Sequence, residues 1–443
     1  MQKKERQAVV IIHGIGEQRP TVTLREFVES VAEHLKSEGK LSNSDVVFWD
    51  KPDPVSGNYE TRKMTMRHIG AQPTTDFYEF YWAHHMRNTS YKHMGDWIKN
   101  VVFRMPHRVS PRLRPVFFFL WGLTLAALAV IAFMTFNSGL DTTKKWLTNI
   151  ATGTAATLVI GIFTNAIYNY LGDAARYFDP SPENIDERMH IRKEGIELLR
   201  NLHNTGGYNR IIIVGHSLGG VIAYDLVKFL WSEYYKTLEP GKAADALSAL
   251  GETELNNRSM LPQRAALQNN DSENWLSNYR NAQLQGFNYL NAIGNKWLIS
   301  DLLTIGTPLA HAGHLFVYRN DLFQKLKNKR EYPTCPPTIE PPDDDFVLSN
   351  DIQLNESGAT NKLNYYTHSS PFAATRWTNI YYSSDFIGGP LKGLFGKGIK
   401  DIRREWKGEP GIFPGTHTRY WEMNNTHSVI NDICQVLKRP KQE

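Results

Sequence analysis

The sequence predicts an α/β fold, a mostly parallel sheet flanked by helices, into which a hairpin of two transmembrane helices is inserted. Continuous apolar runs rich in β-branched residues, typical of buried parallel strands, occur at 7–12 and 210–214. Each run ends in a turn that contains glycine, and the second turn leads directly into a helix-like segment that begins at Val221. A long uncharged stretch at 116–136 lies between the two runs and is the source of the predicted insertion.

The turn after the second run contains the most informative motif of the chain. It reads Gly215-His216-Ser217-Leu218-Gly219. A serine on a tight strand-to-helix turn has an exposed hydroxyl, and the flanking glycines avoid collisions that a β-carbon would cause. The helix that follows directs its N-terminus, and the Leu218 amide, toward the position where an oxyanion would form. The motif therefore predicts Ser217 as a nucleophile, Leu218 as an oxyanion-hole donor, and the other three residues as supporting groups.

The turn after the first run reads His13-Gly14-Ile15-Gly16. In hydrolases with a nucleophilic serine on such a turn, a loop after an early strand supplies a second backbone N–H for the oxyanion. This pattern favours the Ile15 amide as that donor, with His13, Gly14 and Gly16 as supporting residues. The two glycines lack the third glycine of a dinucleotide-binding fingerprint, so no nucleotide cofactor is predicted.

These motifs make the chain resemble the α/β-hydrolases of the lipase and esterase type, over most of residues 6–232 and 297–435. The resemblance implies a serine, acid, histidine order along the chain. A later strand-like run at 302–305 continues into a Gly-Thr-Pro turn similar to that of lipase-like members. The run at 377–382 is followed by Asp385, which we predict to be the acid.

Other aspartates have poorer contexts for that role. Asp301 precedes a strand-like run, and Asp225 lies on the helix behind the serine, where a structural partner is expected. A further acidic run, at 343–345, lies in a proline-rich loop that is typical of a solvated surface.

Two histidines are candidates for the general base. His417 lies in a loop that enters an aromatic segment, whereas His427 opens the last amphipathic stretch. A base needs a loop position from which its ring reaches both serine and acid, which favours His417. The His-x-x-Tyr-Trp sequence around it also resembles the histidine loop of membrane-associated bacterial hydrolases. The adjacent His84 and His85 are expected to point apart, and no metal or other cofactor is predicted. The segment 76–82 that precedes them is predicted to be a further strand of the sheet.

Residues 116–136 carry no charge and are long enough to cross a bilayer as a helix. The second stretch, 147–170, is uncharged but more polar, and is ambiguous by itself. Because one active site needs the loop at Gly14 and the turn at Ser217 on the same side of a membrane, we expect an even number of crossings. A transmembrane hairpin satisfies this condition, and a pair of helices lying on the bilayer surface satisfies it equally well.

Flanking charge predicts which side of the membrane the remainder occupies. Arginines precede the first stretch and follow the second, at 104–114 and 176, whereas the turn between them carries two lysines. The positive-inside tendency places the hydrolase portion in the cytoplasm. Only two cysteines, Cys335 and Cys434, are present, which suits a reducing compartment. The sequence thus predicts an integral membrane protein with a cytoplasmic catalytic domain.

The predicted organisation has three parts. Residues 1–110 and 173–443 form the two halves of the α/β domain, 111–172 form the membrane hairpin, and the polar segment 235–296 is a possible lid over the active site. The chain has 443 residues and a net charge of +5, and no basic aromatic platform indicates nucleic acid binding.

The expectation from sequence is a membrane-anchored serine hydrolase that cleaves acyl esters, with a lipid or another acyl ester as its substrate, through Ser217, His417 and Asp385. A thioesterase or deacylase acting on lipidated molecules, or an acyltransferase, would use the same three residues. A membrane scaffold of hydrolase fold without turnover is the alternative of a different class.

Overall fold

The computed structural model describes residues 5–15, 19–39, 48–67, 73–86, 177–178, 182–205, 207–268, 274–317, 320–339, 345–353, 360–406, 415–422 and 429–438, together with isolated positions between 112 and 132. The chain divides into two compact units. The first comprises Met1–Gly14, Gln18–Trp82 and His190–Glu443, and the second comprises Ile15–Glu17 and Ala83–Met189. The sheet and the residues Ser217, Asp385 and His417 belong to the first unit.

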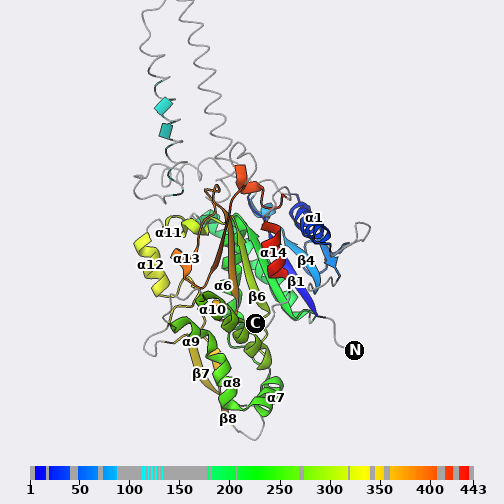
Figure 1. Cartoon of the computed structure of the whole chain (residues 1–443), viewed down its shortest axis with the longest axis vertical. Helices are drawn as coiled ribbons and strands as arrows, with labels where there is room; N and C mark the ends of the chain where they lie inside the picture. The colour runs from blue at the N-terminus through cyan, green and yellow to red at the C-terminus, as the bar shows by residue number, and fades with distance from the viewer. Residues whose placement is uncertain are drawn as a thin grey trace, which may run out of the picture. The chain divides into compact units, whose positions relative to one another are not determined.

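An eight-stranded sheet with the order β10-β9-β6-β5-β1-β4-β3-β2 forms the centre of the first unit (Figure 1). Neighbouring strands pair in parallel from β10 to β4, and the pairs β4–β3 and β3–β2 are antiparallel. The strands are β1 (Arg6–Ile12), β2 (Phe48–Pro52), β3 (Arg62–Met66), β4 (Thr74–Phe80), β5 (Arg210–His216), β6 (Ile299–Ile305), β9 (Arg376–Tyr382) and β10 (Lys400–Arg404), and a separate antiparallel pair consists of β7 (Val347–Gln353) and β8 (Thr360–Tyr366). The predicted α/β class and mostly parallel sheet are confirmed.

The strands predicted from sequence are the ones buried on both faces. In β5, every residue from Arg210 to Gly215 is buried, and in β6 all seven residues are buried. Because helices cover both faces of a parallel sheet, its central strands have no solvated side and need no polar alternation. The edge strand β2 has no fully buried residue, which is why its sequence carries no comparable apolar run.

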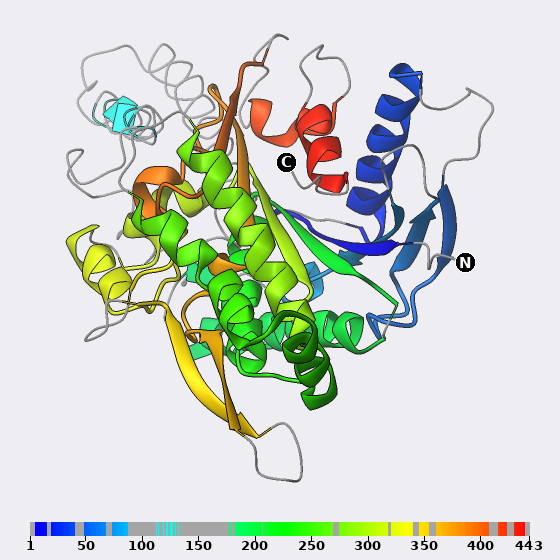
Figure 2. The same ribbon diagram turned by 60° about the horizontal axis from the view of Figure 1, so that its bottom comes forward.

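The described residues also form helices, some of which pack on the two faces of this sheet. They are α1 (Val22–Ser37), α5 (Pro182–Asn204), α6 (Leu218–Tyr234), α7 (Pro240–Leu250), α8 (Glu252–Ser259), α9 (Leu261–Leu267), α10 (Trp275–Ala292), α11 (Ala312–Leu315), α12 (Asn320–Asn328), α13 (Lys392–Phe395) and α14 (Val429–Leu437), with short 3-10 helices η1 (Ala83–Met86), η3 (Pro308–His311), η4 (Pro371–Ala373) and η5 (Gly415–Thr418). Figure 2 shows α1 and α14 side by side on one face. Their apolar residues form one core with β1, β5 and β6, while α6 packs on the opposite face.

The prediction of a transmembrane hairpin is contradicted. Among the described residues, no helix combines the length and the apolar character needed to cross a bilayer. The long helices α5 and α10 have 23 and 18 residues, but charged and amide side chains interrupt them throughout, and a span needs about 20 predominantly apolar residues. The prediction of an integral membrane protein and the membrane part of the functional expectation are therefore corrected. The two apolar stretches within 111–172 lie largely outside the described residues.

The possible lid, 235–296, contains helices α7 to α10. Leu284 and Phe287 of α10 and Lys242 of α7 line a cleft of about 890 Å³ together with residues at the amino-terminal ends of β1, β5 and β6. Ser217 follows the carboxyl end of β5, at the opposite edge of the sheet. The lid over the active site stays a prediction.

Candidate active site

Ser217 lies between the carboxyl end of β5 and the first residue of α6, and its backbone is in an unusual conformation. Its φ of 54° and ψ of −127° lie outside the regions that side chains ordinarily favour. The surrounding backbone is correspondingly crowded: a Cβ on Gly215 would lie 2.5 Å from the carbonyl oxygen of Gly219, and one on Gly219 would lie 2.1 Å from that of Ile12. Both glycines are therefore required by close backbone approach, as the sequence motif predicts.

The loop after β1 passes directly beside the serine. A Cβ on Gly14 would lie 2.9 Å from the Cβ of Ser217. His13 donates from Nδ1 to the carbonyl oxygen of Gly14 at 2.8 Å, and its ring stacks on Trp82 with centroids 5.1 Å apart. The Trp82 indole in turn donates to the carbonyl oxygen of His13 at 3.0 Å. These contacts hold the loop against the Ser217 turn, which is the supporting position expected for His13 and Gly14.

Asp385 follows β9 and is buried. Its Oδ1 accepts the backbone N–H of Ile387 at 2.9 Å, and its Oδ2 accepts Nδ1–H of His417 at 2.9 Å and the hydroxyl of Tyr420 at 2.7 Å. Burial alone would raise the pKa of Asp385, but the charge and hydrogen bond of His417, with the other two donors, hold the pKa below its ordinary value. The carboxylate is thus ionised at neutral pH although water is excluded from it.

His417 lies on η5 and links the acid to the serine. Its Nε2 is 2.8 Å from Oγ of Ser217, while its Nδ1 faces Asp385. An ionised carboxylate can only accept, so the neutral imidazole carries its proton on Nδ1 and offers the lone pair of Nε2 to the serine hydroxyl. The structure brings the predicted Ser217, His417 and Asp385 together from three separate turns. The alternative base, His427, lies outside the described residues.

His216 supports the loop that carries His417. Its Nε2–H donates to the backbone carbonyl of His417 at 3.0 Å, and the two imidazole rings stack with centroids 5.3 Å apart. Burial, followed by repulsion from His417, lowers the pKa of His216 to about 3. A neutral His216 adds no positive charge beside the imidazole that would receive the serine proton.

Leu218 begins α6, so its amide belongs to the first turn, whose N–H groups have no partner within the helix. Its role as an oxyanion donor stays a prediction. Ile15, the second predicted donor, belongs to the other compact unit. Gly16 lies outside the described residues, and the roles of Ile15 and Gly16 stay predictions.

The rejected aspartates have structural partners. Asp225 on α6 accepts two hydrogen bonds from the guanidinium of Arg192, at 2.5 and 3.1 Å, which confirms the structural role expected for it. Asp301 lies inside β6, not before it, and forms ion pairs with two arginines at the amino edge of the sheet. Of the acidic run at 343–345, only Asp345 lies among the described residues.

Sequence reasoning missed the groups that hold the acid in place. Tyr420 and His417 both donate to Oδ2 of Asp385. Gly306, with φ of 55°, leaves space for the Tyr420 ring and for Oδ2, because a Cβ there would lie 2.6 Å from the ring and 3.0 Å from the oxygen. Ser384 and Thr416 join the acid loop to the histidine loop through their hydroxyls at 3.1 Å. A tyrosine three residues after the histidine and a glycine after β6 were visible in the sequence, but their partners lie on other loops.

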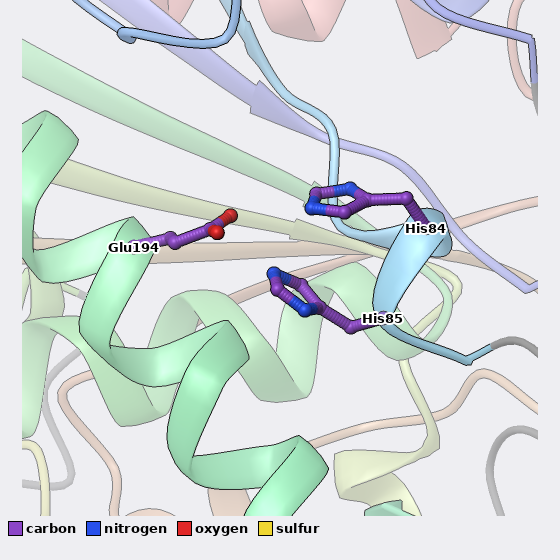
Figure 3. A group of neighbouring side chains, drawn as sticks. All are labelled: His84, His85 and Glu194. Atoms are coloured by element: carbon purple, nitrogen blue, oxygen red, sulfur yellow. The ribbon is translucent and has the colours of Figure 1, made fainter.

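The adjacent histidines outside this site do not point apart as expected. Figure 3 shows His84 and His85 on η1, and their ring centroids are 4.0 Å apart. Glu194, drawn in the same view, belongs to the first unit, whereas the two histidines belong to the second. Within the described residues, neither unit by itself contains three histidine, cysteine or carboxylate side chains close enough to share a metal ion.

Comparison with protein-family models found no match, and comparisons with curated proteins and with solved structures found no significant similarity.

Proposed function

We propose that the chain is a serine hydrolase of the α/β-hydrolase type that cleaves acyl esters. The observation that carries the proposal is the continuous path from Oγ of Ser217 to Nε2 of His417 at 2.8 Å, and from Nδ1 to Oδ2 of Asp385 at 2.9 Å. A nucleophile, a base and a carboxylate that orients the base are the parts that acyl transfer needs, and they are defined by geometry and role.

In the proposed reaction, Oγ of Ser217 attacks the acyl carbonyl carbon while Nε2 of His417 takes the hydroxyl proton. The carbonyl oxygen becomes an oxyanion beside the Leu218 amide at the positive end of α6. The imidazolium formed is paired with Asp385 and returns its proton to the departing alcohol oxygen as the ester bond breaks. Water then attacks the acyl-serine with His417 as base, releasing the carboxylic acid and restoring the serine.

Local strain supports the proposal beyond the hydrogen bonds. The Ser217 conformation, with positive φ, costs of the order of 1–3 kcal/mol and persists only where the surroundings impose it. Here the turn directs Oγ of Ser217 toward His417. The side chain makes no hydrogen bond that would cap α6. Strain that disables a cap and exposes a hydroxyl to a base is typical of a nucleophile.

The proposal is tested by reacting the purified chain with a fluorophosphonate probe and with p-nitrophenyl esters of increasing acyl length. We expect labelling and turnover in the wild type and neither in Ser217→Ala, with kcat lower by about 10⁴-fold or more. The matched control is Ser232→Ala, an exposed serine at the far end of the same helix, which should keep both activities.

Each outcome discriminates between functions. Labelling that survives Ser217→Ala, or a folded wild type that is never labelled, would contradict the serine hydrolase and favour the non-catalytic scaffold. Labelling without ester turnover, followed by transfer to added thiol or alcohol acceptors, would point to the acyltransferase, and a preference for thioesters over oxygen esters would point to the thioesterase.

A further inference from the structure

Tyr420 contacts the acid of the candidate site directly. Its hydroxyl lies 2.7 Å from Oδ2 of Asp385, the same oxygen that accepts Nδ1–H of His417 at 2.9 Å. Both Tyr420 and Asp385 are almost completely buried, with 1% and 2% of their surface exposed. Both groups are therefore shielded from bulk solvent.

The direction of this hydrogen bond is fixed by its neighbours. The backbone N–H of Tyr382 donates to the Tyr420 oxygen at 3.1 Å, so that oxygen acts as an acceptor on one side and its proton is directed to Asp385 on the other. Burial, and then the charge of Asp385, raise the pKa of Tyr420 well above its ordinary value, so the hydroxyl keeps its proton. Tyr420 is thus a permanent donor to the carboxylate.

Packing holds the ring in the position that this bond requires. The Tyr420 ring stacks on Tyr382 with centroids 4.6 Å apart and an angle of 22° between planes. On another side, the ring passes so close to Gly306 that a Cβ there would lie 2.6 Å from it. A ring fixed in this way presents its hydroxyl to one oxygen of one carboxylate.

We propose that Tyr420 is a positioning residue of the Ser217–His417–Asp385 site, whose hydroxyl fixes Oδ2 of Asp385 toward Nδ1 of His417 and keeps the carboxylate in its ionised form. The inference rests on the proposed serine hydrolase function. Removing the hydroxyl takes from Oδ2 one of its donors, so the oxygen that faces Nδ1 of His417 is held less firmly. The imidazole would then lose the orientation that its proton transfer to and from Ser217 requires.

The test is Tyr420→Phe, which keeps the ring and removes only the hydroxyl. Because a hydrogen bond to a charged group is the stronger kind, we expect kcat to fall about tenfold to a hundredfold with KM nearly unchanged. The carboxylate that has lost a donor binds a proton more readily, so the acid limb of the kcat/KM profile should move to higher pH, by about one unit.

The matched control is Tyr289→Phe, which removes a buried hydroxyl that donates to a backbone carbonyl, that of Asn364, at 2.8 Å. Tyr289→Phe should lower the midpoint of thermal unfolding by about as much as Tyr420→Phe does. It should leave kcat and the pH profile unchanged. In an Asp385→Asn background, Tyr420→Phe should have no further effect on kcat, since the group through which it acts is already removed.

A reduced kcat without a shift of the acid limb, or a loss that adds fully to that of Asp385→Asn, would overturn the inference. So would a Tyr420→Phe chain that fails to fold, because the hydroxyl would then serve the stability of the loop. Fluorophosphonate labelling separates this failure from failure of the proposed function: Ser217-dependent labelling of the wild type supports the function whatever Tyr420→Phe does.

Discussion

Two buried aspartates are kept ionised by different partners. One lies near the amino-terminal ends of the sheet strands, and the other lies beyond their carboxyl-terminal ends. Asp301, near the start of β6, lies 2.8 Å from Arg376 and 3.6 Å from Arg210. Asp385, beyond the end of β9, is surrounded by an imidazole, a phenol and a backbone N–H. In both cases burial raises the pKa, and the partners more than reverse this effect. The charges of Arg376 and Arg210 contribute most at Asp301, whereas His417 contributes most at Asp385.

The difference separates a structural carboxylate from one suited to catalysis. Arginine does not release its proton in proteins, so the pair around Asp301 has a single protonation state and can only hold strands together. In the proposed reaction, the imidazole beside Asp385 takes the proton of Ser217, and its pairing with the carboxylate becomes stronger when it carries that charge. A buried carboxylate whose partner can gain a charge is able to stabilise the intermediate of a proton transfer.

The largest expected effect is that of Asp385→Asn. The amide cannot stabilise the imidazolium and can favour the wrong tautomer of His417, so we expect kcat to fall by about 10⁴-fold, as in other triads. The amide has a single acceptor oxygen, which can keep either the Ile387 N–H or the Tyr420 hydroxyl. The free energy of unfolding should therefore fall by about 1–3 kcal/mol, less than the catalytic loss. Ester turnover and urea unfolding of the same preparations measure the two effects.

The control for that experiment is Asp50→Asn, an exposed aspartate of β2 that pairs with two arginines, at 2.9 and 3.1 Å. It should leave kcat unchanged. A fall in kcat of less than tenfold in Asp385→Asn would remove Asp385 from the site and reopen the choice of acid.

The next effect is on stability and concerns the other edge of the sheet. Asp301→Asn leaves the guanidinium groups of Arg376 and Arg210 without their anion in a largely buried setting, which should lower the free energy of unfolding by about 3–5 kcal/mol. Asp50→Asn, which breaks exposed pairs of the same composition, should cost less than about 1 kcal/mol. Urea denaturation gives both values, and equal costs at the two sites would show that burial does not distinguish them.

The difference between buried and exposed regions also explains how much of the fold could be predicted from the sequence. Strands β1, β5, β6 and β9 lie inside a sheet that is covered on both faces. Their sequences are therefore continuous apolar runs, which can be recognised without the structure. The pair β2–β3 at the edge is short and partly exposed, and its pairing depends on contacts with β4 that no local pattern records. The transmembrane prediction was wrong, since no helix of the described residues is long and apolar enough to cross a bilayer.

In the candidate site, local constraints were predictable and long-range ones were not. The turn at Ser217 is specified by its own glycines, and the expected order serine, acid, histidine indicates Asp385 and His417 in the later part of the chain. Tyr420 contacts Asp385 across 35 positions of sequence, and the ion pair of Arg210 with Asp301 joins two strands. Such pairings follow from how the strands are ordered in space, so they became visible only in the fold.

A third buried carboxylate extends the comparison, because it has no cationic partner within the described contacts. Glu79, near the end of β4, is 1% exposed, and its Oε2 accepts the backbone N–H of Thr21 at the start of α1. Its Oε1 has no hydrogen-bond partner within the described part of the chain. Burial raises the pKa of Glu79 to about 7, and the backbone donors Thr21 and Leu24 only partly oppose this. Backbone N–H groups alone therefore do not hold this carboxylate ionised.

The smallest expected effect follows from that raised pKa and has a definite sign. Between the ordinary value of 4.5 and about 7, the folded chain holds a proton on Glu79 that the unfolded chain has released, so stability falls as the pH rises through this window. The loss should approach about 3 kcal/mol above pH 7. Glu79→Gln, neutral at every pH, should lack this part of the decline. Urea unfolding of both chains at pH 5 and pH 8 measures it, and parallel pH dependences would show that Glu79 is ionised in the folded state, as Asp301 and Asp385 are.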